Sequence, residues 1–197
     1  MGKLLAKQQG AMVLGAAFDE VLAAAREGTE WAVTALYRDV QPPLLAYLRA
    51  VEPGDADDLA SDVWLGVGRG LARFEGNESA FRGWVFTIAR RRVIDTRRRR
   101  ARRQTDPVDA EDLAAIGGLD DPEAAALDAV RADDVRRRIV ELLPPAQADV
   151  VLLGIVGGLD AGQIADVLGK RPNAVRVLQH RALRRLAKAF DARGVTK

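Results

Sequence analysis

The sequence predicts an all-α fold, built as two small helical domains that are joined by an acidic, extended linker. Apolar residues recur at spacings of three and four along most of the chain, and no segment alternates for long as a strand would. The periodicity breaks over residues 104–122, where proline, glycine and acidic residues accumulate. After the break, residues 160–181 have the pattern of a helix-turn-helix. At 197 residues, the chain is long enough for two such domains.

The break also sets the predicted domain boundaries. Residues 1–15 are assigned as an N-terminal tail and residues 16–103 as the first domain. Residues 104–122 are the linker, and residues 123–193 form the second domain.

The first domain is predicted to begin with two helices. The first covers residues 16–27 and stops at Gly28, where glycine commonly ends a helix. Thr29 can cap the second helix. We expect Pro42 and Pro43 to bend or restart that second helix, because proline removes a backbone hydrogen bond inside a helix.

A third helix is predicted after the acidic run of residues 55–58, which offers an N-cap and first-turn acids. Its apolar residues recur at helical spacing: Leu59, Val63, Trp64, Val67 and Leu71. The glycine-containing segment of residues 75–79 then predicts a short loop before the next helix.

The fourth helix is predicted to start near Phe81 and to continue into a dense run of arginines. Nine of the fourteen residues from 90 to 103 are arginine, and only Asp95 opposes them. One apolar stripe precedes the run: Phe81, Trp84, Val85, Ile88 and Ala89. We assign Phe81 and Trp84 to the core and not to base stacking. Because the run continues this stripe, we interpret it as a structured nucleic-acid-binding face and not as a solvated tail.

The second domain is predicted to start near Glu123 and to end in the helix-turn-helix. Ala165 lies where two crossing helices approach closely, and Gly169 ends the first of them. The shared core consists of Ile164, Leu168, Val175 and Leu178. The second helix places base-reading candidates near its start: Asn173, Arg176, Val177, Gln179 and His180. Phosphate contacts are expected from a second set: Lys170, Arg171, Arg181, Arg184 and Arg185. The alternative is a plain antiparallel helix pair with a basic rim.

Charge and composition narrow the function classes. The net charge is only +2, but residues 90–103 carry +8, residues 104–123 carry −7, and residues 170–190 hold seven cations and no acid. This alternation indicates two nucleic-acid-facing surfaces with an acidic connector between them. The chain has no cysteine and a single histidine, His180, so we expect no disulfide, metal or other cofactor. No apolar run approaches the ~20 residues of a membrane span, and we expect a cytoplasmic protein without membrane insertion.

In this order, the motifs resemble the bacterial RNA polymerase sigma factors of the extracytoplasmic-function (ECF) group. The resemblance covers about residues 18–190. It rests on the segments Asp55–Leu59, Phe81–Trp84, Ile88–Arg90, Val93–Asp95 with the arginines that follow, Leu143–Pro144, and Ala174–Arg176 leading into His180–Leu183.

The resemblance implies that the first domain binds the clamp helices of core polymerase and opens the minus-ten promoter element. The clamp-facing positions are Asp58, Ser61 and Asp62. Two carboxylates four residues apart form an acidic strip that suits a basic partner helix, although complementing the helix dipole is an alternative role. For the minus-ten element, the resemblance points to Asn77 as a base reader and to four residues of the arginine-rich helix: Arg91, Asp95, Arg97 and Arg98.

For the second domain, the resemblance implies recognition of the minus-thirty-five element and contact with the polymerase flap. Gln163 stands where the family commonly has glutamate. The acidic linker corresponds to the family's connector toward the active-site channel. An anti-sigma factor between the two domains is expected as the inhibitor, in preference to self-control. Such a protein melts promoter DNA through binding energy, without catalysis, and associates with the nucleoid when active.

Two other classes remain open at this point. A stand-alone helix-turn-helix regulator has a similar second domain, but it needs no clamp-facing acids, second basic helix or acidic connector. A magnesium-dependent enzyme is the other alternative, because Asp57, Asp58 and Asp62 loosely match an acidic metal site on a helix. No second acidic cluster on a facing helix is evident, which weighs against the enzyme.

Overall fold

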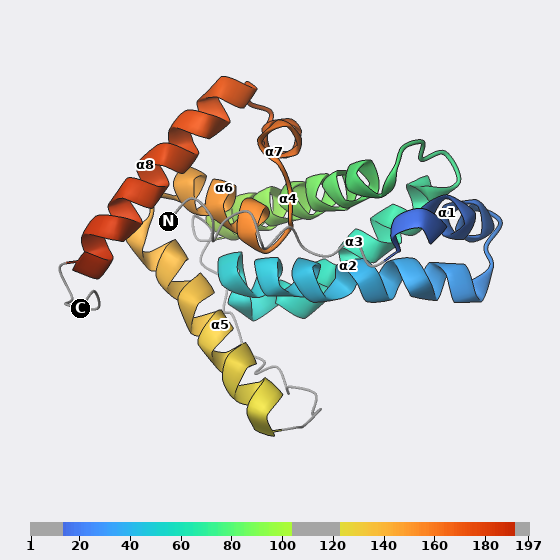
Figure 1. The fold of residues 1–197 in the computed structure, drawn as a ribbon, viewed down its shortest axis with the longest axis horizontal. Coiled ribbons are helices and arrows are strands. Elements are labelled where there is room, and N and C mark those ends of the chain that lie inside the picture. The colour runs from blue at the N-terminus through green and yellow to red at the C-terminus, as the bar shows by residue number, and fades with distance from the viewer. Residues whose placement is uncertain (1–13, 104–122, 192–197) are drawn as a thin grey trace.

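The computed structural model describes residues 14–103 and 123–191. The predictions for residues 1–13, for the linker at 104–122 and for residues 192–197 lie outside the described residues. Within the described ranges, the structure has eight α-helices and no strand (Figure 1). This confirms the predicted all-α class.

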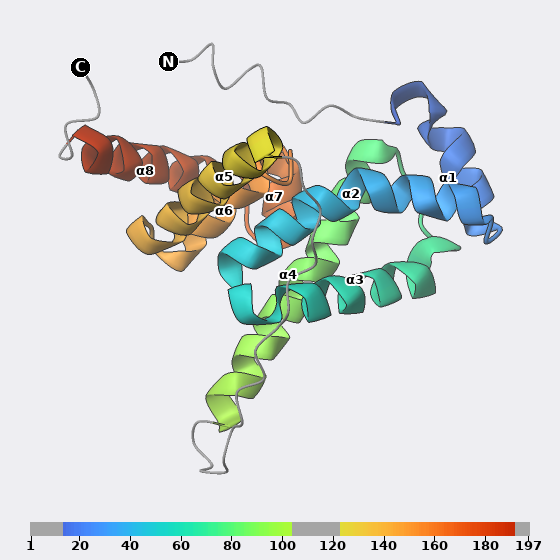
Figure 2. The same ribbon diagram turned by 90° about the horizontal axis from the view of Figure 1, so that it is seen from below.

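The first four helices form one packed unit. They are α1 (Phe18–Arg26), α2 (Glu30–Val51), α3 (Ala56–Leu71) and α4 (Glu78–Arg103). Helix α2 contacts each of the other three, and α3 also packs along α4. Figure 2 shows α4 crossing α2 and α3 and extending beyond them at its C-terminal end. The largest fully buried side chains of this unit are Tyr47, Phe81, Phe86, Leu36, Leu44 and Leu48.

The sequence predicts a bend or a restart at the two prolines of α2, and the structure excludes the restart. Helix α2 is a single element of 22 residues that contains Pro42 and Pro43. Residues on both sides of the prolines are fully buried, including Val40 and Leu44. We attribute the continuity to this packing, which offsets the hydrogen bonds that the prolines cannot donate. Gly28 ends the preceding turn with a φ of +80°, as the predicted helix stop requires.

The residues predicted to cap α2 and α3 lie at the N-cap positions, but their side chains form no capping hydrogen bond. Thr29 and Asp55 are the N-cap residues, but neither side chain accepts a hydrogen bond from its helix. The Asp55 carboxylate is paired instead with Arg100 of α4, at 2.6 Å. Trp64, predicted as core, is only partly buried, and its indole nitrogen donates to Gln41 Oε1 at 2.7 Å.

Helix α4 carries the whole arginine run without interruption. It starts one turn earlier than predicted, because Asn77 caps it: Asn77 Oδ1 accepts the backbone N–H of Ala80 at 2.9 Å. Phe81 is buried, and Trp84 packs against the core and stacks on Phe74. This confirms their assignment to the core. The arginine run is therefore part of a core-anchored helix of 26 residues.

The last four helices form a second packed unit. They are α5 (Glu123–Leu142), α6 (Pro145–Ile155), α7 (Ala161–Leu168) and α8 (Pro172–Asp191). Helix α8 contacts α5, α6 and α7. The core of this second unit includes four fully buried side chains: Leu152, Leu153, Ile164 and Val175.

The helix-turn-helix has the geometry that the sequence predicts. Asp160 caps α7 in a reciprocal capping box with Gln163. Gly169 ends α7 in the left-handed conformation, with a φ of +61°. Pro172 opens α8, where its fixed φ suits a helix start. Of the predicted shared core, Ile164 and Val175 are fully buried, whereas Leu168 and Leu178 are partly buried.

The two units pack directly against each other. Helix α7 lies on α4, and α5 contacts α2. Figure 1 shows α6 and α7 beside α4, with α8 on the outer side. The charge pattern did not predict this contact, because it indicates two separate basic surfaces.

Candidate functional site

The arginine run on α4 divides into two faces with different surroundings. Arg91 and Arg98 are exposed and form no ion pair with a described residue, and Asp95 lies exposed between them. These three residues recur at intervals of three and four, so they share one side of the helix. This side combines cationic groups with one acceptor, which suits a nucleic-acid backbone together with a base edge.

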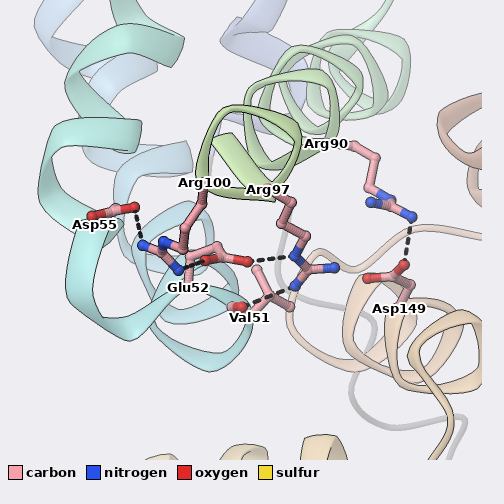
Figure 3. Close-up of polar contacts among 7 residues, drawn as sticks. All are labelled: Val51, Glu52, Asp55, Arg90, Arg97, Arg100 and Asp149. Atoms are coloured by element: carbon pink, nitrogen blue, oxygen red, sulfur yellow. Dashed lines mark hydrogen bonds and ion pairs between the residues drawn. The ribbon is translucent and has the colours of Figure 1, made fainter. Parts of the chain in front are cut away.

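The other face of the run is held by acids of the protein itself. Arg97 donates from Nε to Glu52 and from Nη2 to the carbonyl of Val51, at 3.0 Å for the latter. Arg100 pairs with Glu52 at 3.2 Å and with Asp55 at 2.6 Å. Figure 3 shows both arginines reaching from α4 to the end of α2 and the start of α3. Arg97, predicted to bind DNA, is thus fixed in orientation although part of it is exposed.

The predicted clamp-facing residues lie together on the exposed side of α3. Asp58 and Ser61 are exposed, and Asp62 is partly buried. The Ser61 hydroxyl donates to the carbonyl of Asp57 at 3.0 Å. Leu65, one turn further along, is 58% exposed and extends this face with an apolar side chain.

A groove between α3 and α4 places two of the predicted clamp-facing residues opposite arginines of the α4 run that are not among the predicted minus-ten residues. Its α3 wall includes Asp58 and Asp62, and its α4 wall includes Arg99, Arg100 and Arg103. A surface with carboxylates on one wall and guanidinium groups on the other can engage a basic protein helix and a polyanion at once.

The loop before α4 exposes only part of the predicted base-reading site. Asn77 is exposed, but its side-chain oxygen is used as the helix cap. Its amide group stays available as a donor. Next to it, Glu78 is buried and accepts the backbone N–H of Gly15 at 2.9 Å, which ties the start of the described chain to this loop.

The predicted reader residues of the second unit are on the outer side of α8. Asn173, Arg176, Val177 and His180 are exposed, and Gln179 is partly buried. Arg176 donates to Asn173 Oδ1 at 3.0 Å, so these two side chains form a pair. The predicted phosphate contacts are all exposed: Lys170, Arg171, Arg181, Arg184 and Arg185.

Sequence reasoning missed the acids that organise the arginines. Arg90, on the same side of α4 as Arg97, pairs with Asp149 of α6 at 2.8 Å (Figure 3). Spacing alone gives no signal for these partners, because the exposed Arg91 and Arg98 recur at the same interval of seven as Arg90 and Arg97. Which acids supply the charge, Glu52 and Asp149, depends on tertiary packing.

A buried polar cluster forms where the two units meet. Burial raises the pKa of the Asp149 carboxyl above its ordinary value, and the charges of Arg90 and Arg97 act against this increase. Burial also raises the pKa of the Tyr47 hydroxyl, and the nearby charge of Asp149 adds to the effect. The ionised form of Asp149 is therefore disfavoured in the interface, and keeping the carboxyl ionised there lowers the stability of the folded state.

Two further properties concern the described residues only. They contain no group of three or more histidine, cysteine or acidic side chains placed to hold a metal ion. Among them, no helix combines the length and apolar character that crossing a membrane requires.

Comparisons with known proteins match both units. The family model Sigma-70 region 2 matches residues 36–103, and the model Sigma-70, region 4 matches residues 137–186. A solved structure, CnrH in complex with the cytosolic domain of CnrY, has a similar fold, with a TM-score of 0.60 and 23% identity. It covers 87% of this chain and 96% of that one.

Curated relatives match nearly the whole chain. The ECF RNA polymerase sigma factor SigD of Mycobacterium tuberculosis is 33% identical over 91% of this chain and 87% of its own length. The ECF RNA polymerase sigma factor ShbA of Streptomyces griseus is 34% identical over 81% of this chain and 88% of its own length. Because the identity extends across both units, the chain belongs to the ECF family of RNA polymerase sigma factors.

Proposed function

We propose that this sigma factor directs core RNA polymerase to promoters by reading the minus-ten and minus-thirty-five elements with its two helical units. The observation that carries the proposal is the groove between α3 and α4. It joins an acidic wall at Asp58 and Asp62 to an arginine wall on one packed unit.

The acidic wall is the proposed site for the clamp helices of the polymerase. Asp58, Ser61 and Asp62 lie along one side of α3, and the carboxylates complement a basic partner helix. Leu65 adds an exposed apolar group to the same side. Polymerase binding at this wall and DNA binding on the exposed side of α4 then hold promoter DNA against the enzyme.

The minus-ten element is the proposed ligand of the exposed side of α4 and of the loop before it. Arg91 and Arg98 contact phosphates, while Asp95 and the Asn77 amide contact an unstacked base. Arg97, oriented by Glu52, supports this side. Melting is driven by binding the unpaired strand, and the chain needs no catalytic group for it.

The minus-thirty-five element is the proposed ligand of α8. Asn173, Arg176, Val177, Gln179 and His180 face the major groove. The cationic residues around them bind phosphates and set the position of the helix: Lys170, Arg171, Arg181, Arg184 and Arg185. The polymerase flap is the proposed protein contact of this unit.

An anti-sigma factor is the proposed inhibitor. The support is an apolar groove where α2, α5 and α6 meet, in which Val135 and Ile155 are 53% and 51% exposed. Large exposed apolar side chains in a groove indicate a protein partner. The variant Val135→Asp/Ile155→Asp should start transcripts normally and resist an inhibitor that blocks the wild type; equal inhibition would contradict this site.

A footprinting experiment separates this function from that of a stand-alone regulator. The purified chain should protect promoter DNA only when core polymerase is present, with protection at both elements and reactive unpaired bases at the minus-ten element. Protection of duplex DNA by the chain alone, unchanged by core polymerase, would support the regulator and refute the proposal.

A further inference from the structure

The loop between α3 and α4, residues 72–77, contacts both ends of the segment that contains α1. This loop carries Asn77, the proposed base reader. The segment consists of the 3-10 turn Gly15–Ala17 and α1 itself, and we call residues 15–26 the α1 segment. Both views place α1 at the same end of the first unit as the loop (Figure 1, Figure 2).

The first contact joins the start of the α1 segment to the start of α4. The backbone N–H of Gly15 donates to Oε2 of Glu78 at 2.9 Å, and Glu78 is only 4% exposed. The other carboxylate oxygen of Glu78, Oε1, has no hydrogen-bond partner among the described residues. Because a buried carboxylate without a partner is unfavourable, the position of Glu78 depends on this one N–H group. Glu78 directly follows Asn77, so the contact also restricts where Asn77 can lie.

The second contact joins the end of the α1 segment to the middle of the loop. Arg26, the last residue of α1, donates from Nη2 to the backbone carbonyl of Phe74. The Phe74 ring stacks on Trp84 with 4.9 Å between ring centroids, and it meets Phe81 edge-on at 5.4 Å. Phe81 in turn lies 6.0 Å from the Phe18 ring of α1. The backbone of Phe74 is therefore held by α1, while its ring is held by α4.

Asn77 depends on the loop for the position of its amide group. Its Oδ1 accepts the backbone N–H of Ala80 at 2.9 Å, so the side chain cannot change rotamer without breaking the helix cap. The amide donor must then follow the loop backbone. Binding constellations work when their groups are held to within about 0.5 Å, which a loop does not achieve without support.

We propose that the α1 segment positions Asn77 for reading a minus-ten base, with Arg26 and Glu78 as the positioning residues. The inference rests on the proposed reading of the minus-ten element by Asn77. Both residues act through the loop and not through contacts of their own with DNA. Without them the loop samples several positions, and the contact between Asn77 and the base loses its selectivity. Helix α1, which carries none of the predicted DNA-binding or polymerase-binding residues, thereby gains a role in promoter selection.

Run-off transcription with core polymerase, from a library with a randomised minus-ten element, tests the proposal. The position read by Asn77 is the one at which Asn77→Ala loses base preference. Arg26→Ala and Glu78→Ala should each lower the preference at that same position by roughly fivefold or more, since a base contact contributes about 5- to 150-fold. Glu78→Gln should retain most of the preference, because its side-chain oxygen can still accept the Gly15 N–H.

Two exposed positions supply the matched controls. Arg38→Ala on α2 and Glu20→Ala on α1 remove the same kinds of side chain away from the two contacts, and they should leave the minus-ten preference unchanged. In all four alanine variants of charged residues, the affinity for core polymerase and the preference at the minus-thirty-five element should stay at the wild-type level. These two readouts separate a positioning role from a general loss of structure.

Each result decides the proposal. Unchanged minus-ten preference in Arg26→Ala and Glu78→Ala overturns it and leaves the two-element function standing. Loss of polymerase affinity, or an equal loss at both promoter elements, also overturns it, because the contacts would then maintain the whole unit. An Asn77→Ala variant with full minus-ten preference removes the reader and the proposal with it. A wild-type chain that starts no transcripts with core polymerase refutes the proposed function itself.

Amide hydrogen exchange gives a second test that does not depend on the role of Asn77. A peptide covering residues 72–80 should exchange faster in Arg26→Ala than in the wild-type chain, because the loop loses one of its two supports. Exchange in a peptide from α3, residues 56–70, should stay the same. Equal exchange of the loop peptide in the two proteins overturns the proposal.

Discussion

Reversing the acidic strip of α3 should remove core polymerase binding and leave the fold intact. The change is Asp58→Lys/Asp62→Lys. Neither carboxylate forms an ion pair with another described residue, and Asp58 is exposed, so the substitution breaks no internal salt bridge. It places two cations where a basic partner helix is expected.

The expected loss follows from the exposure of the site. An exposed ion pair contributes up to about 1 kcal/mol net. Reversal removes this attraction and adds repulsion of similar size at each of the two positions. The sum is about 4 kcal/mol, or roughly a thousandfold increase in Kd.

Fluorescence anisotropy of labelled protein, titrated with core polymerase at fixed ionic strength, measures this loss. The matched control is Glu27→Lys/Glu141→Lys, which changes the net charge equally at exposed sites on other elements. Binding by the α3 variant within threefold of the wild type would refute the reasoning. An equal loss in the control would show that only the total charge matters.

Three further results are expected. Arg82→Ala should lower the free energy of unfolding by about 3–5 kcal/mol, because Asp39, whose side chain is 3% exposed, loses its partner at 2.8 Å; a urea-unfolding loss below about 1 kcal/mol would contradict this. Arg176→Ala should reduce the binding free energy for the minus-thirty-five element alone by about 1–3 kcal/mol. A uniform loss of affinity across promoter sequences would instead make Arg176 a phosphate contact. The raised pKa of Asp149 means that its ionised form costs stability, so wild-type stability relative to Asp149→Asn should fall as pH rises from about 4; a pH-independent difference would disagree.

The fold class was predictable because the signals are local. The capping box at Asp160, the left-handed Gly169 and the apolar stripe that leads into α4 each depend on residues within a few positions of one another. The continuity of the arginine run was predictable for the same reason. Helix α2 was different, because burial on both sides of Pro42 and Pro43 outweighs their local preference.

The surroundings of the candidate site depended on contacts between distant parts of the chain. Gln163 and Ser79 are 84 residues apart in sequence, and no periodicity links them. Glu52 holds two arginines only because the end of α2 comes beside the last turns of α4. The sequence could place the charges on helical faces, but it could not predict which of them neutralise one another.

Run-off transcription with purified core polymerase on a genomic promoter library tests the central claim most directly. Core polymerase with this chain should start transcripts at discrete promoters that share sequence at both elements, and each component alone should not. Absence of any new start site, together with no measurable affinity for core polymerase, would contradict the account.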